Sequence, residues 1–475
     1  MLKTPQNTNE KIQKTVALHN LGCKVNGYEM DVMQQNLQKS GYKIVPFDQK
    51  ADIYIVNTCT VTNIADRKSR QMLHKAKKEN PDAVVVAVGC YVQTGEDKIE
   101  KDDCIDLAIG NNKKKDLVPL LEEYLGNREK NKENNISEPP DKTLAGKTME
   151  NLEVPCNYEE LKLTRTRENT RAFIKIQDGC NQFCSYCVIP FARGRVRSRK
   201  PEDVIEEVKT LADAGFLEVV ITGIHLSSYG LDFMEEAPQY NQAIEHAGKL
   251  LLELLEQIDK IDKIKRIRLG SLEPRIISES FMEGLVKLKK VCPHFHLSLQ
   301  SGCDTVLERM NRKYTTEEFE QKVELIRNTY EHPAITTDVI VGFPGETETE
   351  FEKTLEYLSN ISLYELHIFK YSRRKGTVAD TMKGQLTDAV KSQRSDVLSE
   401  IDEKCSMDFR AYYVGKNVDV LIEEYKEIDG ETYQIGHTSE YVKVAVKSEK
   451  DLTNTLCKVS IDKMLNNEVL QGSLA

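Results

Sequence analysis

The feature that most constrains the fold is a repeated alternation between short runs of β-branched residues and longer segments of helical period. Ala83–Val88, with the sequence AVVVAV, is typical of a central strand of a parallel sheet, which is buried on both faces. Over residues 14–126 the alternation predicts a βαβ-type domain. Its strands are expected over residues 15–21, 53–57, 83–88 and 105–109, and its helices over residues 28–39, 64–78 and 117–125.

The alternation resumes over residues 164–400. Six strands are expected there, over residues 172–176, 218–222, 265–269, 294–300, 335–341 and 365–371. A helix is expected to begin at Pro201, because proline suits the first helical position and the next two residues are acidic. Six consecutive βα repeats predict a closed or partly closed parallel β/α barrel. A flat doubly wound sheet is the alternative.

Two segments depart from this alternation. Residues 127–163 are polar and charged and contain the pair Pro139-Pro140, so we predict a linker that is in part disordered. Residues 401–468 hold short β-prone runs separated by glycine turn signals, which predicts a small antiparallel β-barrel. The chain of 475 residues has room for about three domains, and the expected class is α/β.

The composition bears on compartment and partners. No apolar run approaches the ~18–20 residues that span a bilayer, and the polar first residues do not form a signal peptide. We therefore expect a soluble, cytoplasmic protein without membrane contact. A net charge of −10 argues, for the chain as a whole, against a general nucleic-acid binder. The twelve cysteines of such a protein favour metal or redox chemistry over disulfides.

Three cysteines lie together in the sequence DGCNQFCSYCVIP. They are Cys180, Cys184 and Cys187, with the spacing C-x3-C-x2-C. The segment follows a predicted strand, which places it at the carboxyl mouth of the barrel, where α/β proteins bind ligands. Three thiolates on a 4Fe-4S cluster leave one iron open for a substrate, whereas a structural zinc site needs four ligands. Chance clustering of structural cysteines is the alternative.

A second set of cysteines is spread over the N-terminal domain. Cys23, Cys59 and Cys90 each follow a predicted strand. The carboxyl ends of parallel strands share one edge of a sheet, so three thiolates far apart in sequence can converge there. Three separate small core residues are the alternative, because free cysteine is often buried.

The spacing of the first set is that of the radical S-adenosylmethionine superfamily, and the chain around it resembles that superfamily. Further matching stretches are TGIHLSSYG (222–230), LSLQSG (297–302), MNRKY (310–314) and GFPGET (342–347). The resemblance implies a 4Fe-4S cluster that binds S-adenosylmethionine and cleaves it to a 5′-deoxyadenosyl radical. It implies cofactor contacts from Gly342, Phe343, Pro344, Gly345, Glu346, Thr347, Ser298, Gln300 and Arg312. A bare GFPG sequence can also be an ordinary turn.

With two three-cysteine sites in this order, the chain from about residue 14 to residue 461 resembles the methylthiotransferase family. The resemblance implies two 4Fe-4S clusters, of which Cys23, Cys59 and Cys90 hold the auxiliary one, and a C-terminal TRAM domain. The sequence LGCKVN around Cys23 is most similar to members that act on threonylcarbamoyladenosine in tRNA. The implied reaction adds a methylthio group at position 2 of N6-threonylcarbamoyladenosine 37 and uses two S-adenosylmethionine molecules per turnover. The implied partners are tRNA, an electron donor and a sulfur source for the auxiliary cluster.

Alternative functions stay open. Other members of the family act on N6-isopentenyladenosine in tRNA or on an aspartate of a ribosomal protein. A non-catalytic iron–sulfur protein that binds RNA or transfers electrons belongs to a different class. The residues after Cys23 disfavour the first two, and the open cysteine site together with GFPGET disfavours the third.

A basic segment offers a site for RNA. Residues 161–200 hold ten Lys or Arg against two Asp or Glu. The alternating arginines after the cysteine loop are expected to point to one side and bind phosphates, and they are Arg193, Arg195, Arg197 and Arg199. A solvated charged face, or binding of a cofactor or substrate carboxylate, is the alternative. GHTSEY resembles TRAM domains, so Tyr441 is expected to contact RNA, although residues 402–475 carry nine Lys or Arg and fourteen Asp or Glu.

Overall fold

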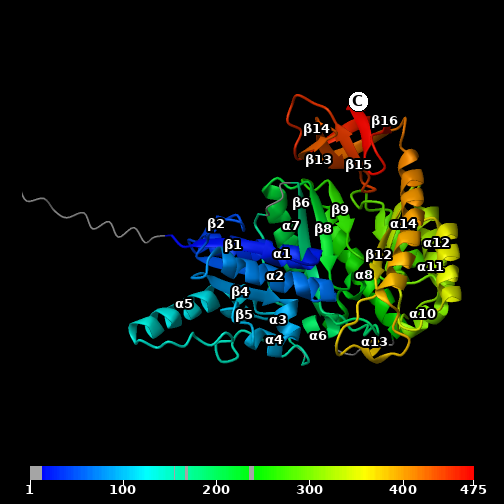
Figure 1. Cartoon of the computed structure of the whole chain (residues 1–475). Coiled ribbons are helices and arrows are strands. Elements are labelled where there is room, and N and C mark those ends of the chain that lie inside the picture. Colours follow the sequence, from blue (N-terminus) through cyan, green and yellow to red (C-terminus); the bar gives the residue numbers. More distant parts are fainter. Residues whose placement is uncertain (1–12, 155, 166–169, 235–239) are drawn as a thin grey trace, which may run out of the picture. The chain divides into compact units, whose positions relative to one another are not determined.

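The structure is a computed structural model that describes residues 13–154, 156–165, 170–234 and 240–475. The chain divides into two compact units, Met1–Asn151 and Leu152–Ala475 (Figure 1). Within the described residues, no helix combines the length and the apolar character that crossing a membrane requires.

The first unit is a parallel five-stranded sheet in the order β2-β1-β3-β4-β5. Its strands are β1 (Thr15–Asn20), β2 (Lys43–Val45), β3 (Ile53–Thr58), β4 (Val84–Gly89) and β5 (Leu107–Ile109). Its helices are α1 (Lys24–Lys39), α2 (Asn63–Glu79), α3 (Cys90–Thr94), α4 (Glu96–Glu100) and α5 (Leu117–Glu133). Helices α1 and α5 cover one face, and α2, α3 and α4 cover the other. The strand order reverses between β1 and β3, and doubly wound sheets bind ligands at the carboxyl edge beside such a reversal.

The end of the first unit differs from the prediction. The helix expected to end at residue 125 continues to Glu133, because the polar stretch after Gly126 is rich in Glu, Lys and Arg, which favour helix. The next segment returns to the sheet, where the Ala108 N–H donates to the Lys142 carbonyl at 3.0 Å. Leu144 is buried in the same core as α5. A large part of the expected linker therefore packs on the first unit.

The second unit begins with an incomplete barrel of six parallel strands. In chain order they are β6 (Arg171–Asp178), β8 (Glu218–Gly223), β9 (Arg266–Leu269), β10 (His294–His296), β11 (Ala334–Val341) and β12 (Glu365–Lys370). Parallel ladders and bridges join each strand to the next. Among the described residues no pairing joins β6 to β12, so the barrel is open on one side. Because the strands follow chain order without a reversal, the partial barrel is confirmed and the flat doubly wound sheet is excluded.

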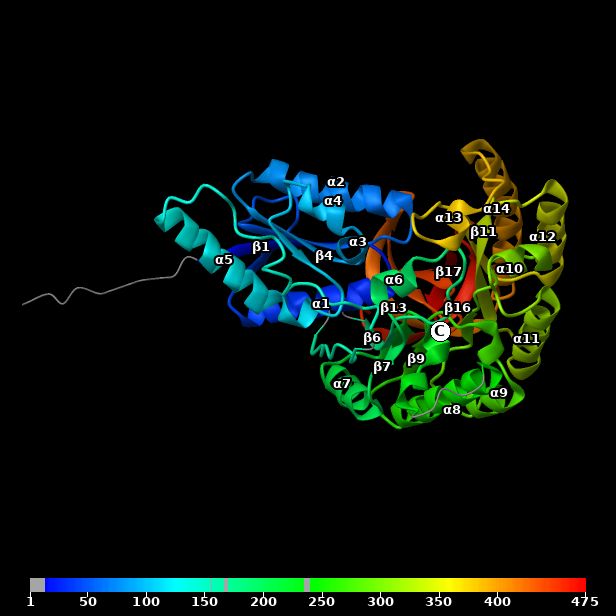
Figure 2. The same ribbon diagram turned by 90° about the horizontal axis from the view of Figure 1, so that it is seen from below.

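Helices cover the outside of this barrel, as Figure 2 shows. They are α7 (Pro201–Asp213), α8 (Tyr240–Asp259), α9 (Glu279–Leu285), α10 (Asp304–Arg309), α11 (Thr316–Thr329) and α12 (Glu348–Ile361). Helix α7 begins at Pro201 as predicted, with two acidic residues in its first turn, and buries Val204, Val208 and Leu211 against the core. This arrangement leaves the inner face of the sheet and the carboxyl ends of its strands for a site.

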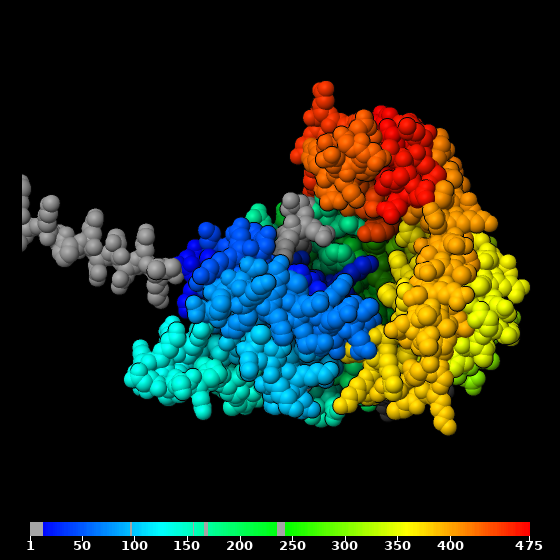
Figure 3. All heavy atoms as spheres, in the orientation of Figure 1, coloured from blue at the N-terminus to red at the C-terminus, as the bar shows by residue number. Residues whose placement is uncertain are grey.

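The C-terminal strands form a closed barrel, coloured orange to red in Figure 3. They are β13 (Asn417–Ile428), β14 (Glu431–His437), β15 (Lys443–Val446), β16 (Thr455–Met464) and β17 (Leu470–Leu474). The long helix α14 (Asp388–Ala411) leads into it. All pairs are antiparallel except that of β15 and β17, so the predicted small barrel is confirmed.

The small C-terminal barrel is fixed to the amino-terminal ends of the strands of the parallel core barrel. Arg171, the first residue of β6, donates to the Tyr441 hydroxyl at 2.7 Å, and Arg266, the first residue of β9, donates to the His437 carbonyl at 2.8 Å. The loop that contains Cys180, Cys184 and Cys187, which we name the cysteine loop, follows Asp178, the last residue of β6. The small barrel and the cysteine loop therefore lie at opposite ends of this strand.

Candidate functional site

The first three cysteines form a loop directly after β6. This strand is followed by Gly179, which has a φ of 72° and packs so closely on Arg195 that an added Cβ atom would be 1.9 Å from its carbonyl oxygen. Only glycine fits this sharp turn. Cys180 is buried, and Cys184 and Cys187 are half-buried. The structure thus places the C-x3-C-x2-C segment at the carboxyl end of a core strand.

The turn after α10 holds this loop in place. The Ser185 hydroxyl donates to the Arg309 carbonyl at 2.8 Å, and the Ser185 N–H donates to the Met310 carbonyl at 3.0 Å. The guanidinium of Arg312 donates to the Cys184 sulfur at 3.2 Å. The MNRKY stretch therefore contacts the cysteine loop directly.

The surroundings of these sulfur atoms fit an iron–sulfur cluster. The Gln182 N–H lies 3.5 Å from the Cys180 sulfur, and the Cys184 sulfur accepts from Arg312, so N–H donors face the sulfurs of this set. Burial raises the pKa of the Cys180 thiol to about 12 and holds the pKa of Cys187 above its usual value. Such thiols ionise only with a cation to stabilise the thiolate, and ligation by a metal provides one. A donor set made only of sulfur is typical of iron–sulfur and zinc sites.

The second set of cysteines lies along the carboxyl edge of the sheet in the first unit. Cys59 and Cys90 directly follow the last ladder pair of β3 and β4. A Cβ atom added to Gly22, the neighbour of Cys23, would be 3.1 Å from the Cys59 sulfur. The structure therefore brings the three cysteines to one edge, and that they hold a cluster stays a prediction.

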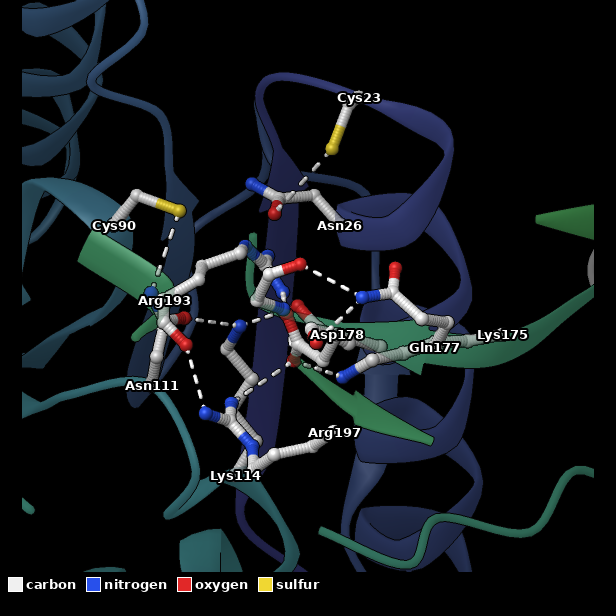
Figure 4. Close-up of polar contacts among 12 residues, drawn as sticks. Cys23, Asn26, Cys90, Asn111, Lys114, Lys175, Gln177, Asp178, Arg193 and Arg197 are labelled. Carbon is white, nitrogen blue, oxygen red and sulfur yellow. Dashed lines mark hydrogen bonds and ion pairs between the residues drawn. The ribbon is translucent and has the colours of Figure 1, made fainter. Parts of the chain in front are cut away.

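An asparagine beside Cys90 was missed by the sequence analysis. The amide of Asn111 donates to the Cys90 sulfur at 3.4 Å (Figure 4). The ammonium of Lys114 donates to the side-chain oxygen of Asn111 at 2.7 Å and forms a fully buried ion pair with Glu29. Lys114 therefore fixes which side of the amide faces the sulfur. The available signal was position, because Asn111 follows β5 at the same edge of the sheet.

The loop of residues 342–347 is a tight turn held by its own glutamate. The buried Glu346 carboxylate accepts from the N–H of Gly342 at 2.7 Å and pairs with Arg394 at 2.6 Å. The Thr347 side chain caps the first turn of α12. These two side chains serve the turn and the helix, because a buried carboxylate needs such partners. Their contact with the cofactor stays a prediction.

The other residues of this turn have different surroundings. Phe343 is fully buried, and its ring lies edge-on to the ring of Tyr186 in the cysteine loop, with centroids 6.4 Å apart. Pro344 is buried, and Gly345 is exposed. The turn thus packs against the cysteine loop through the contact of Phe343 with Tyr186.

Two of the predicted cofactor contacts lie together beside the cysteine loop. Arg312 donates to the Ser298 carbonyl at 3.2 Å as well as to the Cys184 sulfur. Gln300 is buried and has a φ of 78°, a conformation that non-glycine residues rarely adopt. Arg312 and Ser298 are therefore placed beside the first cysteine set.

Three of the four arginines expected to bind phosphates are buried in contacts within the protein. Arg193 pairs with Asp178 at 3.1 Å, and Arg197 lies 3.7 Å from the same carboxylate (Figure 4). Arg199 forms a fully buried ion pair with Glu207. The expectation was wrong for these three, because Asp178 of the same segment lies beside Arg193 and Arg197, and Glu207 of α7 pairs with Arg199.

The fourth arginine differs from the others. Arg195 is exposed, and its guanidinium lies 4.5 Å from the centre of the Phe183 ring. Arg167, which the positive balance of residues 161–200 includes, lies outside the described residues. Of the four alternating arginines, only Arg195 is placed to meet a phosphate.

Tyr441 lies between the small barrel and the core. Its ring stacks on His437 with centroids 4.5 Å apart, and the guanidiniums of Arg171 and Arg268 lie 5.1 Å and 4.7 Å from its centre. Its hydroxyl accepts from Arg171. The structure therefore gives this residue a docking role, and its contact with RNA stays a prediction.

Replacing Tyr441 by alanine should lower the melting temperature by roughly 5 °C or more, because the buried guanidiniums lose their aromatic partner. Thermal unfolding followed by circular dichroism measures this effect. The matched control is Tyr425→Ala, since Tyr425 is 50% exposed on β13 and should leave the melting temperature unchanged. An unchanged melting temperature together with weakened RNA binding would instead favour the predicted contact of Tyr441 with RNA.

Polar residues on the inner face of the core were also missed. The rings of His296 and His367 stack with centroids 5.2 Å apart, and His296 lies 3.3 Å from the carboxylate of Asp338. Although burial acts to raise it, hydrogen bonding and charge from His296 keep the pKa of Asp338 below its usual value. Burial lowers the pKa of His225 to about 3, so this ring is neutral, and its Nδ1 lies 2.6 Å from the Ser228 hydroxyl. For His296, Asp338 and His367 the available signal was a polar residue within an otherwise apolar strand, whereas His225 follows β8 in the stretch 222–230 already quoted in the sequence analysis.

Two family models match the chain. The model of the radical SAM superfamily matches residues 174–358, and the model described as uncharacterized protein family UPF0004 matches residues 15–110. The first contains Cys180, Cys184 and Cys187, and the second contains Cys23, Cys59 and Cys90.

Curated relatives resemble the chain over most of its length. Threonylcarbamoyladenosine tRNA methylthiotransferase MtaB of Bacillus subtilis is 38% identical over 94% of each chain. The protein of the same name from Aquifex aeolicus is 40% identical over 88% of this chain and 95% of its own. The tRNA-2-methylthio-N(6)-dimethylallyladenosine synthase of Moorella thermoacetica is 33% identical over 97% of this chain and all of its own.

Solved structures share the fold. The radical S-adenosylmethionine methyltransferase TsrM from Kitasatospora setae, with cobalamin and a 4Fe-4S cluster bound, superposes with a TM-score of 0.52. The match covers 78% of this chain and 77% of that chain at 18% identity.

Proposed function

The chain belongs to the methylthiotransferase family of radical S-adenosylmethionine enzymes, and from this premise we propose that it adds a methylthio group at position 2 of N6-threonylcarbamoyladenosine 37 in tRNA. The observation that carries the choice of substrate is the graded similarity. Relatives named for threonylcarbamoyladenosine are 32–40% identical and relatives named for dimethylallyladenosine are 32–35% identical, and the two highest values, 38% and 40%, both belong to the first group. The LGCKVN sequence around Cys23 supports the same choice.

A radical S-adenosylmethionine enzyme uses a 4Fe-4S cluster and S-adenosylmethionine. In this proposal Cys180, Cys184 and Cys187 hold the cluster that binds S-adenosylmethionine, and the three edge cysteines of the first unit hold a second one. When bound, the clusters supply the electron that cleaves S-adenosylmethionine and the sulfur that is transferred. Three thiolates at each site leave one iron open for these roles.

The protein's own residues orient the ligands and tune the sulfurs. Arg312 donates to the Cys184 sulfur, and the Asn111 amide donates to the Cys90 sulfur. Hydrogen bonds to thiolates shift the reduction potential of an iron–sulfur cluster. Neutral His225 can accept or donate a hydrogen bond without adding a charge to the site.

The test is the nucleoside content of tRNA from a strain that lacks the gene. We expect 2-methylthio-N6-threonylcarbamoyladenosine to disappear and N6-threonylcarbamoyladenosine to accumulate, since the precursor is no longer consumed. Liquid chromatography with mass spectrometry measures both nucleosides, and a plasmid with the intact gene is the control that restores the product.

Other outcomes separate the alternatives. Loss of the methylthio form of isopentenyladenosine, with the threonylcarbamoyl product retained, would assign the other tRNA substrate. Unchanged tRNA with an unmodified ribosomal-protein aspartate would assign that protein. If purified, reconstituted enzyme releases no 5′-deoxyadenosine with a reductant, catalysis itself would be excluded.

A further inference from the structure

Helix α2 of the first unit carries an unusual excess of positive charge. It contains six Lys or Arg against only Asp66 and Glu79. No other described helix of eight or more residues has a positive balance. In a chain with a net charge of −10, this excess makes α2 a local cationic surface.

Two of the six cations have partners within the protein. Lys77 pairs with Asp106 at 2.6 Å, and the guanidinium of Arg70 lies 5.9 Å from the centre of the Tyr91 ring. The remaining four are exposed and form no ion pair with a described residue, and they are Arg67, Lys68, Lys75 and Lys78.

These four cations lie on one side of the helix. At about 100° per residue, they fall within an arc of about 100°, and they span about 16 Å along the axis. The opposite side is fixed to the sheet, because Ser69, Leu73 and Ala76 are fully buried. The cations are therefore presented by a rigid element as one stripe, which we name the α2 stripe.

The stripe begins near the second cysteine set. Thr62 caps α2 by accepting from the Ala65 N–H at 3.1 Å, and it lies three residues after Cys59. Val61 and Ile64, near this end, are 49% and 57% exposed. Helix α2 thus has an apolar end beside the sheet edge that carries Cys23, Cys59 and Cys90, which we name the cysteine edge. Its cations lie further along the helix. This arrangement suits a polymer with apolar bases and a charged backbone.

We propose that the α2 stripe binds the phosphate backbone of the substrate tRNA. The inference rests on the proposed function, in that tRNA is the substrate. Since Arg193, Arg197 and Arg199 are buried, the proposal assigns to a different element the phosphate contacts that were expected of them. The contacts are electrostatic, so they add affinity without reading the base sequence.

The test compares the salt dependence of tRNA binding. The variant is R67Q/K68Q/K75Q/K78Q in the anaerobically reconstituted full chain, because glutamine removes the charge and keeps helix propensity. The slope of log affinity against log salt is negative, and each lost phosphate contact reduces its magnitude by about 0.7–0.9, so the loss of four contacts reduces the magnitude by about 3. We expect affinity to fall roughly tenfold or more at low salt. The iron content, and the release of 5′-deoxyadenosine without tRNA, should stay unchanged.

A matched control removes the same number of charges elsewhere. The variant K209Q/K260Q/K287Q/K289Q changes four exposed lysines on the outer side of the core and should keep the slope of the wild type. Equal slopes for the α2 variant and the wild type would overturn the inference. Should the quadruple variant misfold, R67Q/K68Q and K75Q/K78Q decide the question, each with about half of the slope change.

The outcome also separates this inference from the proposed function. Wild-type enzyme that binds tRNA yet does not modify threonylcarbamoyladenosine would reject the proposed substrate, and the slopes would still decide the role of α2. Wild-type enzyme that binds no tRNA would overturn both.

Discussion

Replacing Cys184 by alanine should abolish the cleavage of S-adenosylmethionine. The remaining Cys180 and Cys187 give two sulfur ligands, too few to hold a cluster that needs three from the protein. The expected result is no 5′-deoxyadenosine above background when anaerobically reconstituted enzyme is incubated with S-adenosylmethionine and dithionite. Iron content should fall by about one cluster per chain, which is a readout independent of turnover.

The control for this experiment is Cys405→Ala. Cys405 is half-buried on α14 and has no other cysteine near it in the sequence, so its loss should leave both iron and cleavage at the level of the wild type. Cleavage by the Cys184→Ala protein at an undiminished rate would reject the assignment of this cysteine set.

Replacing Cys59 by alanine separates the two chemical steps. Sulfur insertion should fall below detection, because the second set then has only two sulfurs at the carboxyl edge of the sheet. Cleavage of S-adenosylmethionine should persist, since Cys180, Cys184 and Cys187 are unchanged. Mass spectrometry of tRNA nucleosides and chromatography of 5′-deoxyadenosine measure the two steps in the same reaction.

Cys104→Ala is the matched control for the second prediction. Cys104 lies in the same unit and is half-buried, yet it is not part of the cysteine edge, so both steps should proceed. Loss of both steps in a folded Cys59→Ala protein, with its melting temperature unchanged, would contradict the division of tasks between the two cysteine sets.

The architecture followed from the sequence because burial on both faces leaves a plain signal. Runs such as Ala83–Val88 are apolar throughout, and β4 is an internal strand of the sheet, between β3 and β5. Strand β2, with three residues and an exposed first position, has no such signal and was not predicted. Strand β17 was missed for a similar reason, since Leu470–Leu474 alternates too briefly to stand out.

The candidate site, too, could be predicted from the sequence only in part. The cysteines were found because their spacing and their positions after strands are local properties of the sequence. The partners of Arg193 and Arg199 were not, since Asp178 and Glu207 reach them only through the fold. A count of charges cannot tell a paired, buried guanidinium from an exposed one, and for this reason the prediction failed for three of the four alternating arginines.

The docking of the small barrel has a consequence for how substrate is chosen. The small barrel contacts the core at Arg171, the first residue of β6, and the cysteine loop begins after Asp178, the last residue of β6. The length of this strand, about 25 Å, therefore separates the small barrel from the cysteine loop. Under the proposed function, any part of a tRNA held where the small barrel joins the core would therefore be remote from the nucleotide being modified. Under the proposed function this domain would select molecules by their overall dimensions, and recognition of the target nucleoside would be left to residues near the cysteine loop.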